Sequence, residues 1–122
     1  MLTHDKSFES FADGIVLICT VTNIAEEGNR PQDGLKKLYH LPFDYKTVGL
    51  ARYIEGRQEN VKITSVISVP YRPDISTQEV VVLGEVQYRI WQLQHISDTR
   101  PPTLKLSLER IVENYEFENS NV

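Results

Sequence analysis

The sequence predicts a mainly β protein, a small antiparallel β-barrel or sandwich with long extended loops and at most one or two short helices. Two observations lead to this prediction. Apolar and polar residues alternate over several short runs, as they do in a sheet with one buried face. The runs are separated by segments rich in Gly, Pro and Asn, which are typical of turns. Five or six such strands close most economically as a barrel or sandwich.

The clearest strand signal lies between residues 80 and 110. Two alternating runs flank Gly84–Glu85, and a Gly between two such runs is typical of a hairpin. A third run follows a break at residues 98–102. The alternating apolar positions are Val80, Val82, Val86, Tyr88, Ile90, Leu104, Leu106 and Leu108. We therefore expect a three-stranded antiparallel meander with strands near 79–83, 86–95 and 103–111.

The first part of the chain is harder to interpret. Residues 1–13 form a polar N-terminal arm in which Phe8 and Phe11 lie three residues apart, a spacing that could place both rings on a partner. Residues 15–24 read as a strand with apolar residues on both faces, which is typical of a strand buried in a barrel or at an interface. Residues 25–37 contain two Gly, a Pro, an Asn and an Asp and are expected to form a surface loop.

The middle of the chain mixes strand and loop signals. Pro42 makes a central strand unfavourable over residues 38–45, so we expect an edge strand or an extended arm there. A second long loop is expected over residues 46–60. Residues 61–69 alternate again and end at Pro70, and Pro73–Asp74 suits the corner of a turn.

The chain is expected to form one domain over residues 1–122, with a barrel over 14–111 and a C-terminal tail over 112–122. The polar tail is expected to fray unless a neighbour holds it. The residues expected in the core are Ile15, Leu17, Val21, Ile63, Ile67, Val82, Tyr88, Ile90, Leu106 and Leu108.

Composition limits the classes of function. The chain has 13 basic and 17 acidic residues, a net charge of −4, which argues against binding nucleic acid through bulk electrostatics. Cys19 is the single cysteine and lies in an apolar run, so we interpret it as a small buried hydrophobic residue. No apolar stretch approaches the ~18 residues of a membrane span, and no signal-type segment follows the N-terminus. We expect a soluble protein made in the cytoplasm, without a membrane partner.

No residue pattern points to catalysis or to a cofactor. His4, His40 and His95 are far apart in the sequence, without the spacing of a metal pair. No Gly-x-Ser-x-Gly elbow and no phosphate-cradling Gly loop is present. The Glu residues of the loop and tail look solvated, whereas catalytic carboxylates need perturbed surroundings. We expect no enzyme activity, no metal and no cofactor.

Two aromatic residues of one predicted strand could form a stacking platform for single-stranded nucleic acid. Tyr88 and Trp91 have opposite parity, which puts them on opposite faces unless a bulge intervenes. Tyr88 is therefore interpreted as core and Trp91 as an anchor for a protein contact.

The order of several segments resembles the head closure proteins of long-tailed phages, also called head completion, stopper or head–tail joining proteins. The likeness covers residues 14–111, and its clearest element is the strand, tight turn and strand of residues 80–90. The segments that carry it are 48–56 (VGLARYIEG), 67–71 (ISVPY), 75–82 (ISTQEVVV), 87–94 (QYRIWQLQ) and 100–110 (RPPTLKLSLER).

The resemblance implies a barrel that assembles as a ring of six or twelve copies below the portal and adaptor proteins. Such a ring closes the DNA exit of the filled head and presents a docking surface for a tail terminator or tail completion protein. Genomic DNA would pass through its channel without specific binding, and the protein would be located in the virion. Residues 25–37 and 46–60 are the two candidates for the loop that family members project toward the channel.

Subunit or partner contacts are expected at Phe8, Phe11, Arg52, Tyr53, Glu55, Arg57 and Trp91. Two other readings stay open. The chain could be another neck or tail protein, such as an adaptor or tail terminator. It could also be a small β-barrel module that binds an oligonucleotide or a peptide. Such a module should carry basic residues interleaved with exposed aromatic residues on one sheet, and only Arg89, Trp91 and His95 are candidates for them.

Overall fold

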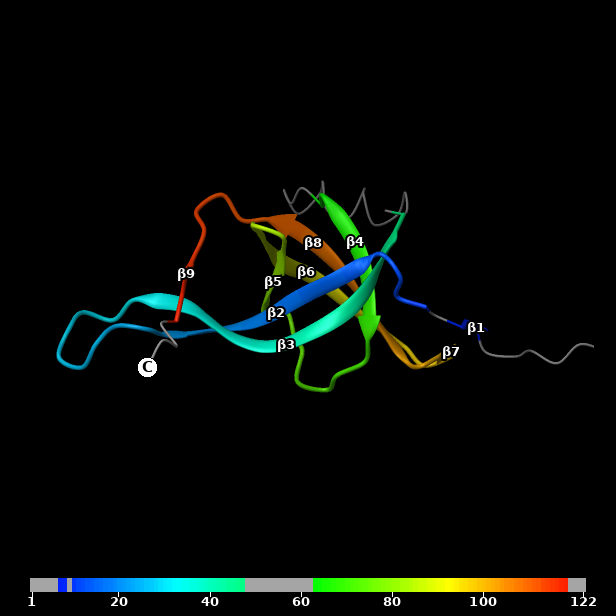
Figure 1. Ribbon diagram of the computed structural model, residues 1–122, viewed down its shortest axis with the longest axis horizontal. Coiled ribbons are helices and arrows are strands. Elements are labelled where there is room, and N and C mark those ends of the chain that lie inside the picture. The colour runs from blue at the N-terminus through cyan, green and yellow to red at the C-terminus, as the bar shows by residue number, and fades with distance from the viewer. Residues whose placement is uncertain (1–6, 9, 48–62, 119–122) are drawn as a thin grey trace, which may run out of the picture.

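A computed structural model describes residues 7–8, 10–47 and 63–118 of the chain. The described part contains strands and no helix: β1 (Ser7–Phe8), β2 (Gly14–Asn23), β3 (Asp33–Lys46), β4 (Ser65–Pro70), β5 (Val80–Leu83), β6 (Val86–Ile96), β7 (Thr99–Arg100), β8 (Thr103–Arg110) and β9 (Glu116–Phe117). The mainly β fold predicted from the sequence is confirmed (Figure 1).

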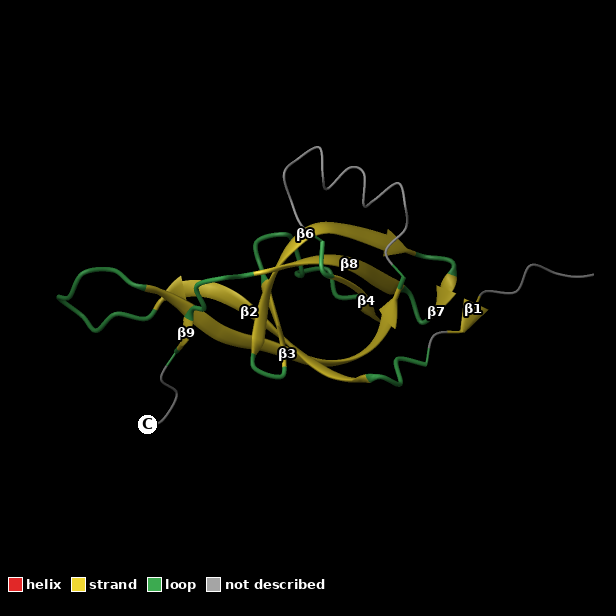
Figure 2. Ribbon diagram, turned by 90° about the horizontal axis from the view of Figure 1, so that it is seen from above, coloured by secondary structure: helices red, strands yellow, loops and turns green. Residues whose placement is uncertain are grey.

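Six strands close a ring in the order β2-β5-β6-β8-β4-β3, because β3 also pairs with β2. Every pairing within this ring is antiparallel. Figure 2 shows the ring from above. Two short strands are added in parallel, β9 beside β3 and β1 beside β7. The architecture is a small closed β-barrel with two-residue strands attached outside the ring.

The meander of β5, β6 and β8 is confirmed, as is the turn at its first corner. Leu83 pairs with Val86 across a two-residue loop in which Gly84 has a φ of 64°. A positive φ at the first central residue is what a type II′ hairpin turn requires, and glycine adopts it without steric cost. The turn at Pro73–Asp74 is also present, since the Ile75 amide donates to the Arg72 carbonyl.

The barrel interior is filled by one cluster of apolar side chains from all six ring strands and from Ile75. Its buried members are Val16, Ile18, Leu41, Phe43, Ile67, Val69, Ile75, Val81, Ile90, Leu104, Leu106 and Leu108. Ile67, Ile90, Leu106 and Leu108 were predicted in the core, and these assignments are confirmed. Tyr88 packs against the cluster while partly exposed.

The core face predicted for the first strand is wrong. Val16 and Ile18 point into the barrel, whereas Ile15 is 63% exposed. Leu17 and Val21 are half-buried and lie against a second apolar cluster, formed by Cys19, Leu35, Val80 and Val82. We call these four residues the outer cluster. Because both faces of β2 are apolar, alternation alone could not decide which face the barrel encloses.

Two predicted boundaries are also wrong. Residues 33–37 belong to β3 and not to a loop, and β3 continues through Pro42 as a strand of 14 residues. Pro42 is tolerated because its strand pairs with β2 there, while β4 and β9 contact β3 only at residues 44–46 and 34–35 among the described residues. β4 begins at Ser65, so Ile63 precedes it and is half-buried.

The C-terminal tail does not fray as far as residue 118. Residues 111–118, which we call the C-terminal arm, run along the outside of the barrel and add β9 to β3 (Figure 1). The arm brings Ile111 and Tyr115 against the outer cluster. The sequence-based expectation failed because it counted polar residues and overlooked these two apolar anchors.

The opposite burial of Leu106 and Ile15 provides a test of this core. Leu106→Ala should lower the free energy of unfolding by ~2–5 kcal/mol, because it removes buried methyl groups and leaves a cavity. Ile15→Ala is the matched control and should change it by less than about 0.5 kcal/mol, since its side chain is exposed. Urea denaturation of both variants measures the difference. Equal losses would show that the assigned faces are incorrect.

Candidate interaction surfaces

The β2–β3 hairpin extends beyond the barrel and ends in a tip, residues 24–32 (Figures 1 and 2). Asn23 holds its base: the side-chain Oδ1 accepts hydrogen bonds from the amides of Ala25 and Gln32, both at 3.0 Å. The Ile24 amide donates to the Gln32 carbonyl at 2.9 Å. Asn suits this position because a short amide side chain can bond nearby backbone groups. The hairpin is thus closed at its base while its tip stays open to solvent.

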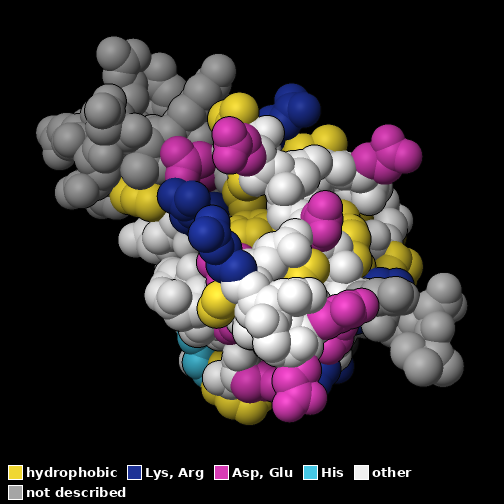
Figure 3. All heavy atoms as spheres, turned by 90° about the vertical axis from the view of Figure 1, so that its left-hand side faces the viewer, with side chains coloured by type: hydrophobic (Ala, Val, Ile, Leu, Met, Phe, Trp, Pro, Cys, Tyr) yellow, Lys and Arg dark blue, Asp and Glu magenta, His cyan; other side chains and the backbone are white. Residues whose placement is uncertain are grey.

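The tip is polar and predominantly acidic. Glu26 and Glu27 face solvent within the tip, against one exposed cation there, Arg30, and just beyond the tip Asp33 is followed by exposed Lys36 and Lys37. Figure 3 looks at this end of the molecule and shows Asp and Glu side chains scattered over it, with one band of Lys and Arg. The loop predicted at residues 25–37 includes most of this tip. The loop is shorter than predicted, because residues 33–37 belong to β3.

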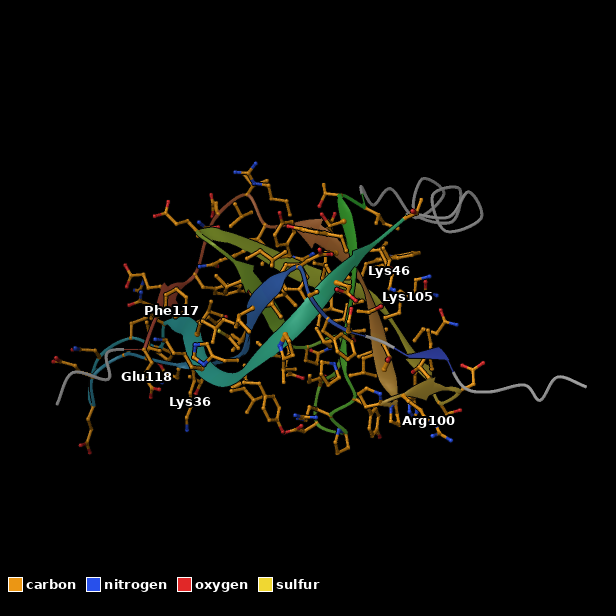
Figure 4. All side chains as sticks on the ribbon, turned by 45° about the vertical axis from the view of Figure 1, so that its right-hand side comes forward. Lys36, Lys46, Arg100, Lys105, Phe117 and Glu118 are labelled. Atoms are coloured by element: carbon orange, nitrogen blue, oxygen red, sulfur yellow. The ribbon has the colours of Figure 1, made fainter. Side chains whose placement is uncertain are left out.

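The opposite end of the molecule is formed by the β6–β8 hairpin with β7 and β1 (Figure 1). Thr99 and Thr103 are buried there, and their hydroxyls lie 2.9 Å apart. Both hydroxyls are also within bonding distance of the Pro101 carbonyl, at 2.8 and 3.1 Å. His95 stacks on Tyr71 with ring centroids 4.1 Å apart. Figure 4 shows Arg100 at this end, far from Lys36, Phe117 and Glu118.

One buried glutamine bonds the C-terminal arm at two places. Gln87 on β6 is 4% exposed, and its Nε2 donates to the Tyr115 carbonyl at 2.9 Å while its Oε1 accepts from the Tyr115 amide at 2.8 Å. The same residue's backbone carbonyl accepts from the Ile111 amide at 2.9 Å. The side-chain amide of Gln87 thus bonds the backbone of Tyr115 as a neighbouring strand would.

Three hollows flank the arm, and Tyr115 lines all of them. Their volumes are about 480, 300 and 460 Å³. The first includes Arg89 and Glu109, whose charged groups lie 3.8 Å apart. The third includes Lys37 and Glu118 beside Val82. Tyr115 is therefore only partly enclosed by its surroundings.

Cys19 lies in the outer cluster and is buried, as predicted. Burial raises the pKa of its thiol from an ordinary 9.0 to about 11, and the nearby Lys37 ammonium opposes this shift only in part. A thiol with a raised pKa is a poor nucleophile at neutral pH, because the thiolate is the reactive form. Among the described residues, no group of three His, Cys, Asp or Glu side chains lies close enough to hold a metal ion. The described part of the chain also has no helix of the length and apolarity needed to cross a membrane.

The structure describes only some of the predicted contact residues. Arg52, Tyr53, Glu55 and Arg57 lie outside the described residues, as does most of the 46–60 loop. Phe8 belongs to β1, which pairs in parallel with β7.

Phe11 and Trp91 are the other predicted contact residues. Phe11 is 7% exposed and has a φ of 50°, and its amide donates to Asp44 at 2.9 Å, so its own chain covers the ring. Trp91 is half-buried at a bulge, because the β6–β8 register passes directly from Ile90 to Gln92. A contact of either residue with a partner stays a prediction.

Sequence analysis missed Gln87 and Tyr115, which organise the arm. Gln87 stands between Val86 and Tyr88 in an alternating run, where it reads as a solvent-facing residue. Its buried position follows only from the arm that crosses it. A Tyr within an otherwise polar tail was the one local signal, because isolated aromatic residues often anchor a segment to a surface.

Comparisons with known proteins identify a fold and no family. No protein-family model matches the chain, and a search of curated proteins finds no match either. Among solved structures, the chain is similar to the solution structure of protein SF1141 from Shigella flexneri 2a, with a TM-score of 0.60 and 16% identity. The match covers 83% of this chain and 94% of that one. At this identity the similarity concerns the fold alone.

We expect Gln87→Ala to loosen the arm. Loss of two buried hydrogen bonds should lower the free energy of unfolding by ~1–3 kcal/mol and speed amide hydrogen exchange at Tyr115. Asn29→Ala, at an exposed position of the β2–β3 tip, is the control and should do neither. Exchange measured by NMR would contradict this role for Gln87 if Tyr115 stayed equally protected in both variants.

The raised pKa of Cys19 predicts a pH dependence of stability. Between pH 9 and 11 the unfolded chain releases the thiol proton while the folded chain retains it, so stability should fall as pH rises through this window. Cys19→Ala should lack this contribution. Urea denaturation of both proteins at pH 8, 10 and 11 isolates the thiol, and a constant difference between them would rule the effect out.

Proposed function

We propose that this protein is a non-enzymatic structural component of the head–tail connector of a tailed phage or prophage particle. In this role it is a head closure protein, which forms a ring below the portal and adaptor and seals the DNA exit. The order of sequence segments from residue 14 to 111 suggested this role. The closed barrel with its attached extensions supports it.

One observation carries the proposal furthest: two hairpins extend from opposite ends of the closed barrel (Figures 1 and 2). A ring of identical subunits needs head-to-tail contacts, in which one patch meets a different patch on the neighbour. A closed barrel offers no free barrel edge for such pairing. The β2–β3 tip and the β6–β8 end supply two distinct surfaces, and copy numbers of six or twelve fit the role.

The charge distribution agrees with a ring that passes DNA. The chain has a net charge of −4, and the tip itself carries Glu26 and Glu27 against Arg30, with Asp33, Lys36 and Lys37 exposed beyond it. A tip directed toward the channel would repel the phosphates of the DNA, since protein affinity for DNA depends on phosphate neutralisation by cations. The tip therefore becomes the preferred channel-facing segment among the described residues.

Contacts with the portal, the adaptor or a tail completion protein would use the remaining surfaces. Trp91 is half-buried at a bulge and keeps part of its indole accessible to a partner. Bulges are common next to functional surfaces because they redirect a side chain. Phe8, Arg52, Tyr53, Glu55 and Arg57 stay proposed contact residues within this model of assembly.

Deletion of the gene from its genome tests the proposal. We expect electron microscopy of induced particles to show filled or DNA-leaking heads separated from complete tails, with tailed particles restored by a plasmid copy. Tails of abnormal length would instead indicate a tail terminator. Normal tailed particles, or a genome that makes no particle, would overturn the phage role and favour an oligonucleotide- or peptide-binding module.

A further inference from the structure

Besides the pairing of β9 with β3, hydrogen bonds between described residues hold the C-terminal arm at four separate points, one of which is the bond from Gln32 Nε2 to the Glu116 carboxylate at 2.9 Å. The Ile111 amide bonds the Gln87 carbonyl, the Gln87 side chain bonds both backbone groups of Tyr115, and the Glu118 amide donates to the Leu35 carbonyl at 2.7 Å. Strand β9 is two residues long. The arm is therefore held by a few discrete contacts and not by a continuous ladder.

Below the arm lies an apolar groove. Its floor is the outer cluster, in which Cys19 is 0% and Leu35 is 1% exposed. In-sheet partners of Cys19, namely Lys37 and Val80, lie beside it and not above it. Part of the cover over this face comes from the arm, whose Ile111 and Tyr115 pack against the cluster beside Leu17 and Val21 of β2. Without the arm, the barrel would expose a continuous apolar patch on β2, β3 and β5.

The hollows around Tyr115 indicate a single anchor in a loosely filled groove. Open hollows of about 480, 300 and 460 Å³ border this one side chain. A partly exposed ring buries less apolar area than a core side chain, so the arm is held less firmly than a core strand. Release of the arm would cost the groove contacts while leaving the barrel ring intact.

Residues 112–114, which join Ile111 to Tyr115, can act as a hinge. Val112 is 95% exposed, and Glu113 and Asn114 are also exposed. An extended chain advances roughly 3.3 Å per residue, so the four steps from Ile111 to Tyr115 could span about 13 Å. That length is enough for Tyr115 to reach the groove of a barrel in direct contact with its own.

We propose that the groove under the C-terminal arm binds the outer part of the arm of a second copy of this chain, so that neighbouring subunits exchange residues 115–118 while Ile111 stays on its own barrel. The occupant follows from identity: each copy carries the segment that this groove already fits, and exchange remakes the same contacts between chains. Swapping of an identical element is a low-cost route to association. This inference rests on the arm's contacts and not on the phage role, so either can fail alone.

A tethered arm has an effective concentration near its own groove in the mM range. The isolated protein should therefore keep its own arm bound, and exchange should dominate only where copies are held side by side or where the arm of one copy is weakened. The experiment therefore mixes a copy that lacks the Tyr115 anchor with a copy whose intact arm is loosely held.

Cys19 reports on the cover, since it is the single cysteine of the chain and is 0% exposed. The acceptor is Tyr115→Ala, which keeps Cys19 and the groove but lacks the anchor. The donor combines Cys19→Ser with Gln87→Ala, so that its intact arm is loosely held. The control donor adds Tyr115→Ala to these two changes.

We expect the acceptor thiol to react with a disulfide reagent at least tenfold faster than the unaltered protein. The donor at several hundred micromolar should slow that reaction severalfold and form a one-to-one heterodimer in light scattering, whereas the control donor should do neither. Protection of the acceptor thiol without any donor would overturn the arm as the cover. A reactive acceptor that the donor neither protects nor binds would overturn the exchange.

A second measurement covers the case in which the Tyr115→Ala acceptor does not fold. A milder acceptor, Tyr115→Leu, is mixed unlabelled with the isotope-labelled donor at millimolar concentration. Filtered nuclear Overhauser cross-peaks should then connect the Tyr115 ring of the donor with the Val80 methyl groups of the acceptor. Their absence from a mixture of two folded chains would overturn the exchange between copies.

Discussion

Closure of the barrel through two short strand contacts is the constraint on which the rest of the structure depends. The β2–β3 hairpin joins the remaining four ring strands through three residue pairs with β5 and three with β4. Strand β3 must leave β2 near Phe43 and continue to β4, which is why it runs for 14 residues. Because the contacts are short, the parts of β2 and β3 beyond them are free to extend as a separate hairpin.

Two bulges adjust this ring to the apolar pattern. Between Ile18 and Cys19 the β2–β3 register shifts past Leu38, so Leu35 faces outward while Leu41 faces the barrel interior. The second bulge, at Trp91, lets Ile90 and Leu93 both turn toward the core although they are three residues apart. A bulge adds one residue to one strand and so reverses the alternation beyond it. Both apolar faces are packed: the inward face lies in the barrel core, and the C-terminal arm packs against the outward face.

The C-terminal arm is one of three described segments outside the ring that can contact a partner. A ring without barrel edges cannot recruit partners by extending its sheet there, so contacts depend on segments added outside it. These are the acidic β2–β3 tip, the β6–β8 end and the C-terminal arm. The arm differs from the other two because it packs into an apolar groove of its own barrel. Its stability is consequently tied to the Gln87 amide and the Tyr115 anchor.

The sequence by itself determined the β class, the meander of residues 80–110 and its turn at Gly84, the turn at Pro73–Asp74 and the burial of Cys19. These depend on local periodicity and turn chemistry, which neighbouring residues encode. Only the tertiary structure decided which face of β2 enters the barrel, how β3 accommodates Pro42, and why Gln87 is buried. Of the candidate contact residues, the structure buries Phe11 in its own chain and places Trp91 at a bulge. Each of these depends on ring closure and on an arm 28 residues away from Gln87, contacts that alternation within one strand does not record.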